Sequence, residues 1–131
     1  MEINNAGMRQ PLVLAYMGDC IYELYVREYL INKYQNIKVN DLHKKAINFV
    51  KAKSQAMAII NIESELTEKE KSIVKRARNQ KSNTVPKNAD IIDYKYATAF
   101  EALIGYLHLN KENERMEHII NKAIEIIDNG M

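Results

Sequence analysis

Residues that make turns are scarce in this sequence, which has four glycines and two prolines among 131 residues. Leu, Ile, Ala, Lys and Glu are abundant instead, and such a composition favours helices and leaves few places for a β-hairpin. The chain is long enough to enclose one hydrophobic core. We therefore expect residues 1–131 to form one all-α domain of five to seven helices.

Cysteine is nearly absent. Cys20 is the one cysteine, so no intramolecular disulfide can form, and its apolar neighbours predict that it packs as a small hydrophobic residue. The first residues, MEINNAGMRQ, lack the charged start and the apolar core of a signal peptide. No stretch approaches the roughly 20 apolar residues that a membrane span needs. These absences predict a cytoplasmic protein that does not enter a membrane.

The formal net charge is only +2, but the basic residues are unevenly distributed. The segment 71–87 contains six basic residues and no acidic one: Lys71, Lys75, Arg76, Arg78, Lys81 and Lys87. By composition alone, this segment fits a solvated surface as well as it fits a nucleic-acid-binding surface.

Apolar residues at helical spacing predict helices over residues 12–33, 40–61 and 112–127, and from Asp93 to residue 107. Asn40 and Asp93 are expected as caps, and Gly130 is expected just beyond the last helix. Thr67 and Glu70 form a capping-box pattern for a helix that ends near residue 79. Residues 80–92 form the longest irregular segment. A glycine inside the first helix, Gly18, indicates that another part of the chain approaches its backbone closely.

Two carboxylates lie within strongly apolar stretches. Asp19 is part of LVLAYMGDCIYEL, and Glu101 is part of ATAFEALIGYLHL. A carboxylate in such surroundings is costly to bury unless a cation or hydrogen-bond donors hold it. For either residue alone, a salt bridge or a cap explains the position equally well. Together they favour a shared divalent-metal site whose oxygen ligands suit Mg²⁺ or Mn²⁺.

Other polar residues give weaker signals. Glu23 lies on the same helical face as Asp19, although a pair with Arg27 is the favoured interpretation. His43, next to two lysines, fits a phosphate contact or an exposed helix start. His43, His108 and His118 show no metal-ligand spacing, and no nucleophile elbow or glycine-rich phosphate loop occurs. Metal-assisted hydrolysis is the reaction class that these residues favour.

The two carboxylate segments also resemble a known family. YMGDCIYELYVREYL is similar to the signature helix of the ribonuclease III family, in which Leu-Gly-Asp carries a catalytic aspartate. TAFEALIGYL is similar to the motif that carries the family's catalytic glutamate. With DLHKKA, KRARNQKS and TVPKN, the resemblance is closest to the short bacterial branch, Mini-ribonuclease III, which lacks a double-stranded-RNA-binding domain.

The resemblance implies a homodimer that cleaves double-stranded RNA, with Asp19 and Glu101 as catalytic residues and as ligands of Mg²⁺ (or Mn²⁺). It implies products with a 5′-phosphate, a 3′-hydroxyl and a short 3′ overhang, and precursor 23S ribosomal RNA as the substrate. RNA binding then falls to the catalytic domain itself, and the expected contacts are Lys75, Arg76, Arg78, Asn79, Lys81 and Lys87.

The sequence also departs from the long-form family pattern. Acidic residues that precede the aspartate by seven and four positions are here Leu12 and Ala15, and an aspartate three residues before the glutamate is here Thr98. The expected site therefore has only two acidic residues of a larger set. An alternative is a catalytically silent RNA- or ribosome-binding module of the same fold, and a third is a helical interaction protein with a structural ion pair.

Overall fold

A computed structural model describes residues 5–81, 87 and 89–130 of the chain. All regular structure within these ranges is helical, which confirms the all-α fold. The long helices are α1 (Pro11–Lys33), α2 (Val39–Val50), α3 (Ala52–Ile62), α4 (Glu68–Arg78), α5 (Ile91–Leu109) and α6 (Asn113–Gly130), and two short 3₁₀ turns are η1 (Ala6–Met8) and η2 (Glu63–Glu65).

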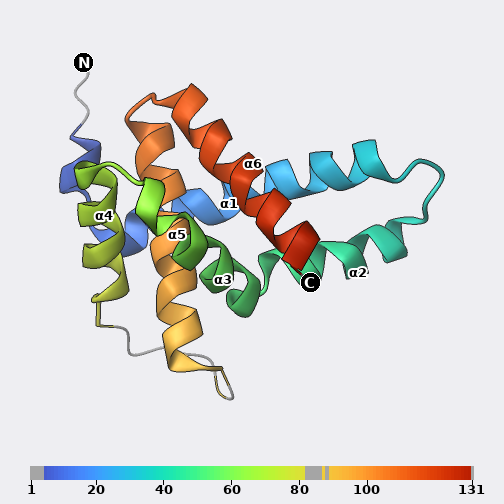
Figure 1. The fold of residues 1–131 in the computed structure, drawn as a ribbon, viewed down its shortest axis with the longest axis horizontal. Helices are drawn as coiled ribbons and strands as arrows, with labels where there is room; N and C mark the ends of the chain where they lie inside the picture. Colours follow the sequence, from blue (N-terminus) through green and yellow to red (C-terminus); the bar gives the residue numbers. More distant parts are fainter. Residues whose placement is uncertain (1–4, 82–86, 88, 131) are drawn as a thin grey trace.

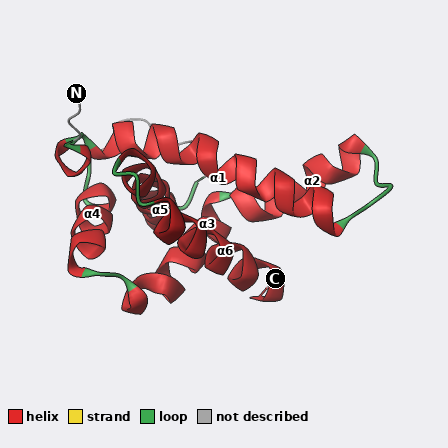
Figure 2. Ribbon diagram, turned by 90° about the horizontal axis from the view of Figure 1, so that it is seen from above, coloured by secondary structure: helices red, strands yellow, loops and turns green. Residues whose placement is uncertain are grey.

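Helix α5 lies at the centre of the molecule (Figure 1). It packs against α1, α3 and α4, while α6 covers α3 and α5. Every residue from Ala102 to Leu107 is buried, so α5 has no polar face over this stretch. The second half of α1 and helix α2 extend together to one side of the other helices (Figures 1 and 2). The apolar ATAFEALIGYLHL segment is thus the central core helix.

Local signals fixed several helix ends as predicted. Helix α1 begins with Pro11 at its first position, where the missing N–H costs nothing. Helix α4 has the predicted capping box: the Glu70 N–H donates to Thr67 Oγ1 at 3.1 Å, and the Thr67 N–H donates to Glu70 Oε1 at 2.9 Å. Arg115 of α6 also donates to both oxygens of the buried Glu70 at 2.9 Å, so the same carboxylate joins α4 to α6.

The prediction of one helix over residues 40–61 was wrong. The helix is interrupted at Lys51, whose ψ of 151° is extended. Helix α2 ends before this residue and α3 begins after it. Two backbone carbonyls at the end of α2 lose their helical partners there. Tyr22 Oη donates to the Phe49 carbonyl at 2.9 Å, and Gln55 Nε2 donates to the Val50 carbonyl at 2.7 Å. These side-chain caps stabilise a break that the spacing of apolar residues did not indicate.

Three smaller expectations about helix ends were also wrong. Helix α2 begins at Val39, and no side chain caps it, so Asn40 is inside the helix. Asp90 rather than Asp93 caps α5, by accepting a hydrogen bond from the Asp93 N–H at 3.0 Å. Helix α6 continues through Gly130 instead of ending before it. In each case the helix extends beyond the residue that propensity favoured as its end.

Candidate active site

The site forms where α1 and α5 cross with their backbones in contact. A Cβ atom placed on Gly18 would lie 1.7 Å from the Glu101 carbonyl oxygen, and one placed on Gly105 would lie 1.9 Å from the Leu14 carbonyl oxygen. Only glycine fits at either position, because backbone atoms so close cannot move aside as a side chain does. The crossing confirms the prediction for Gly18, and it brings Asp19 next to Glu101.

The carboxyl groups of Asp19 and Glu101, the carboxylate pair, lie within hydrogen-bonding reach of each other. Glu101 is half-buried, whereas Asp19 is exposed, so the expectation that both lie in apolar surroundings holds only for Glu101. Burial, and then the neighbouring Asp19 charge, raise the pKa of Glu101 to about 8. Two carboxyl groups held this close, one of them half-buried, form a site that favours a proton or a cation between them.

Sequence reasoning missed a third polar residue at this site. Gln55 of α3 is 2% exposed, and its side-chain amide lies within hydrogen-bonding reach of the Glu101 carboxyl, where it opposes the rise in the pKa of Glu101. Its Oε1 atom is buried with no hydrogen-bond partner among the described residues. Gln55 is four residues before Ile59 and seven before Ile62, both buried, so a polar residue at core spacing was the available signal.

The donor set fits a magnesium-type cation. The described part of the chain has no group of three or more His, Cys, Asp and Glu side chains that could hold a metal. Mg²⁺ requires fewer protein ligands, since it keeps several waters and commonly takes one or two carboxylates. The carboxylate pair and the unpaired Gln55 oxygen are hard oxygen donors of that kind. Asp19 and Glu101 are therefore the residues that would hold Mg²⁺.

At positions 12, 15 and 98, where the family pattern has further acidic residues, this chain has no residue that supplies a third ligand. Leu12 and Ala15 have apolar side chains, one exposed and one buried. The Thr98 hydroxyl donates to the Tyr94 carbonyl at 3.0 Å, a bond within its own helix. Glu23 forms the predicted pair with Arg27, at 2.5 Å between Arg27 Nη2 and Glu23 Oε2. Among the described residues, the structure thus brings two acidic residues together here, Asp19 and Glu101.

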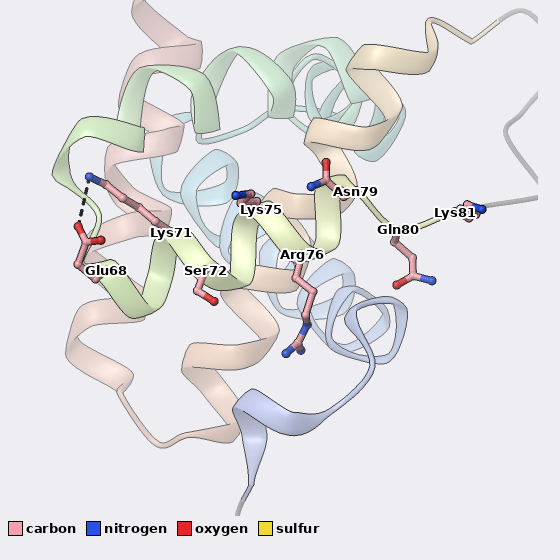
Figure 3. Close-up of a pocket in the computed structure, with 8 residues that line it drawn as sticks. All are labelled: Glu68, Lys71, Ser72, Lys75, Arg76, Asn79, Gln80 and Lys81. Atoms are coloured by element: carbon pink, nitrogen blue, oxygen red, sulfur yellow. Dashed lines mark ion pairs between the residues drawn. The ribbon is translucent and has the colours of Figure 1, made fainter.

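Helix α4 and the residues after it carry the basic surface, whose basic residues are Lys71, Lys75, Arg76 and Lys81. This surface is hollowed into a shallow depression of about 840 Å³ (Figure 3). Its lining residues are Glu68, Lys71, Ser72, Lys75, Arg76, Asn79, Gln80 and Lys81. Four of the six expected RNA contacts, Lys75, Arg76, Asn79 and Lys81, therefore lie together along this surface. The one acidic residue, Glu68, lies at its end, 3.8 Å from the Lys71 ammonium group.

Arg76 lines the depression but has its guanidinium engaged, and the two remaining expected RNA contacts lie outside the depression. The Arg76 guanidinium donates to the carbonyls of Gly7 and Arg9, at 2.8 and 2.6 Å, and so ties the segment around η1 to α4. Arg78 lies outside the depression, 5.6 Å from the centre of the Tyr96 ring. Lys87 is exposed but does not line the depression.

Residues 12–112 match the family model described as Ribonuclease III domain, and this range contains Asp19, Gln55, the basic surface and Glu101. The chain belongs to the ribonuclease III family. Membership of this family makes the chain an endoribonuclease and confirms the resemblance found in its two carboxylate motifs.

Several proteins that are similar to this chain are named Mini-ribonuclease 3. The chain is 51% identical to one from Clostridium tetani over 97% of this chain and 85% of the relative. It is 41% identical to one from Symbiobacterium thermophilum over 99% of both chains. A crystal structure of a Fusobacterium nucleatum protein superposes with a TM-score of 0.81, at 37% identity, over 90% of this chain and 93% of that one. The similarity to the short branch therefore covers nearly the whole chain.

Proposed function

We propose that the protein is a magnesium-dependent endoribonuclease that cleaves double-stranded RNA, with Asp19 and Glu101 as its catalytic carboxylates. One observation carries this proposal: the Gly18–Gly105 crossing brings two carboxyl groups together beside a buried amide oxygen that has no hydrogen-bond partner among the described residues. Such an arrangement destabilises the metal-free fold, so a purely structural ion pair does not explain it.

The bound Mg²⁺, or Mn²⁺ in its place, would supply a polarised water and offset the charge that builds up on the scissile phosphate. Asp19, which is exposed, offers its carboxylate on the side open to substrate. Glu101 is half-buried on the central helix α5 and offers its carboxylate from the interior side of the site. Attack by water on the phosphorus breaks the bond to the 3′ oxygen, which takes up a proton, so the products carry a 5′-phosphate and a 3′-hydroxyl.

The basic surface on α4 is proposed to bind the RNA backbone. Double-stranded RNA is recognised chiefly through its shape, phosphates and 2′-hydroxyl groups. Lys75 and Lys81 offer exposed ammonium groups for phosphates, and Asn79 offers an amide for 2′-hydroxyl groups. Arg76 reaches the same surface, although two backbone carbonyls occupy its guanidinium. We place Arg78 and Lys87 beside this surface, as secondary contacts.

A homodimer is proposed from an unusual face of α1. An apolar stripe of five exposed residues recurs there at spacings of three, four or seven: Val13, Tyr16, Cys20, Leu24 and Ile31. The expectation that Cys20 packs into the core was wrong, and its place in this stripe is the reason. Exposed apolar residues that recur along one side of a helix in this way are typical of a protein interface. A second copy placed on this stripe would lie next to Asp19.

Precursor 23S ribosomal RNA is the substrate we propose, on the ground that the relatives form the short ribonuclease III branch. None of the helices described is long and apolar enough to cross a membrane. The RNA is a cytoplasmic molecule, so we place the protein in the cytoplasm as well.

One assay tests the catalytic proposal. The protein is incubated with a long RNA duplex and Mg²⁺, in parallel with Asp19→Asn and with an EDTA control. We expect Mg²⁺-dependent cutting that ends in 5′-phosphates and is lost in the variant. Equal cleavage by Asp19→Asn would refute the assignment. Binding of the duplex without cleavage by the wild type would instead indicate a catalytically silent RNA-binding module.

A further inference from the structure

Gln55 is a buried polar residue whose contacts go beyond what is needed to form helix α3. Its side chain is 2% exposed and reaches two groups: the Val50 carbonyl, at 2.7 Å from Nε2, and the Glu101 carboxyl. A carbonyl oxygen only accepts hydrogen bonds, so the contact with Val50 fixes which end of the amide carries the nitrogen. The second N–H of that nitrogen is then available to the Glu101 carboxyl.

The other end of the amide is the unusual part. Gln55 Oε1 is buried without a hydrogen-bond partner among the described residues. An unpaired buried acceptor costs about 1–3 kcal/mol, so a side chain present only to cap α2 would be expected to have its oxygen paired or exposed. The oxygen instead belongs to a group that touches one of the two proposed metal ligands. A cation held by two carboxylates keeps several waters, and each water needs acceptors.

We propose that Gln55 is a positioning residue of the metal site. Its amide N–H holds the Glu101 carboxylate in its binding orientation, and its carbonyl oxygen accepts a hydrogen bond from a water bound to the cation. This inference rests on the proposed function of the carboxylate pair. In this role, Gln55 would partly replace the acidic residues that the family pattern has at positions 12, 15 and 98 and that this chain lacks.

The test compares two buried residues that cap the same helix end. Gln55→Met removes the amide and keeps a side chain of similar length. Tyr22→Phe removes the neighbouring cap, the 2.9 Å hydrogen bond to the Phe49 carbonyl, and leaves the Gln55 amide in place. Both variants lose one hydrogen bond at the α2–α3 break, so both should have lower melting temperatures. Only Gln55→Met should change metal binding.

The primary readout is Mn²⁺ affinity, measured without RNA by isothermal titration calorimetry. Loss of a group that orients a ligand typically weakens metal binding by about 10- to 100-fold, and we expect a loss in this range for Gln55→Met. Tyr22→Phe should stay within about twofold of the wild type. In cleavage assays, the Mg²⁺ concentration for half-maximal rate should rise for Gln55→Met, with most of the rate recovered at saturating Mg²⁺.

A second measurement needs no folded variant. In the wild-type protein, the Gln55 side-chain amide signals in a ¹H–¹⁵N spectrum should shift during a Mg²⁺ titration and follow the same saturation curve as metal binding. Unchanged Mn²⁺ affinity in Gln55→Met, or stationary Gln55 signals at saturating Mg²⁺, would overturn the role of Gln55 and leave the carboxylate pair as the site. No saturable binding by the wild type would overturn both proposals.

Discussion

Without divalent metal at pH 8, replacing Glu101 by glutamine is expected to stabilise the fold although it removes one of the two proposed catalytic groups. The raised pKa of Glu101, about 8 against an ordinary 4.5, follows from its burial and from the Asp19 charge. A glutamine keeps the shape and carries no charge, and its amide N–H can donate to Asp19 as the protonated carboxyl does.

The magnitude follows from proton linkage. Between pH 4.5 and 8 the unfolded chain releases the Glu101 proton while the folded chain keeps it, so metal-free stability falls as pH rises through this window. At about 1.4 kcal/mol for each pKa unit, the difference amounts to at most about 5 kcal/mol at pH 8. Because Glu101 retains some solvent contact, we expect a gain of about 1–3 kcal/mol for Glu101→Gln, similar to other stabilising active-site changes.

Urea unfolding, followed by circular dichroism in EDTA at pH 5 and at pH 8, measures this difference. The variant should match the wild type at pH 5 and exceed it at pH 8, with equal m-values. Added Mg²⁺ should reverse the order, because only the wild type gains stability from the bound cation. A variant less stable than the wild type in EDTA at pH 8 would refute the reasoning, since Glu101 would then be an ordinary stabilising group.

Four further predictions concern separate parts of the molecule. Gly18→Ala should destabilise the protein by at least about 3 kcal/mol in urea unfolding, because the added Cβ meets backbone 1.7 Å away. Burial acts to raise the pKa of Glu70, but the hydrogen bonds from Arg115 and Thr67 lower it below its ordinary value. The Glu70–Arg115 pair should therefore stabilise the folded protein above pH 4.5, and this contribution should be lost as the pH falls further. Accordingly, Glu70→Gln should lose about 2–4 kcal/mol at pH 7, and much less at pH 3, in the same assay. Lys75→Gln should reduce the slope of log affinity for duplex RNA against log salt concentration by about 1, measured by filter binding, without changing the melting temperature. Leu24→Arg, in the apolar stripe of α1, should convert a dimer to a monomer in sedimentation experiments, and an unchanged sedimentation coefficient would show that this face is not the interface.

The sequence predicted those features that depend on local chemistry. Pro11 at the start of α1 and the Thr67 capping box are local in this sense, since each is complete within a few residues. Gly18 was also informative, because a glycine inside an apolar helix has few explanations other than close backbone contact. The nature of that contact, a crossing with Gly105, is a tertiary property that no local pattern encodes.

The break at Lys51 and the role of Gln55 could not be predicted for the same physical reason. Both depend on hydrogen bonds to the end of α2, one from Tyr22 in α1 and one from α3. Apolar spacing continues across residues 40–61, so periodicity alone predicts one helix. Which face of α1 meets α5 was equally hidden: Asp19 and Cys20 have apolar neighbours in the sequence, yet both are exposed.

Substitutions at Gly18 and at Glu101 distinguish the contribution of this site to stability from its contribution to activity. The glycine crossing stabilises the fold and also brings the carboxylates together, so a change at Gly18 should reduce stability and activity in parallel. The Glu101 carboxyl is supported by that crossing but opposes folding in the absence of metal, so a change there should move stability and activity in opposite directions. If both changes reduced stability, the carboxylate pair would be a structural part of the core. Opposite signs would mean that the core holds two repelling groups together for the cation that they bind.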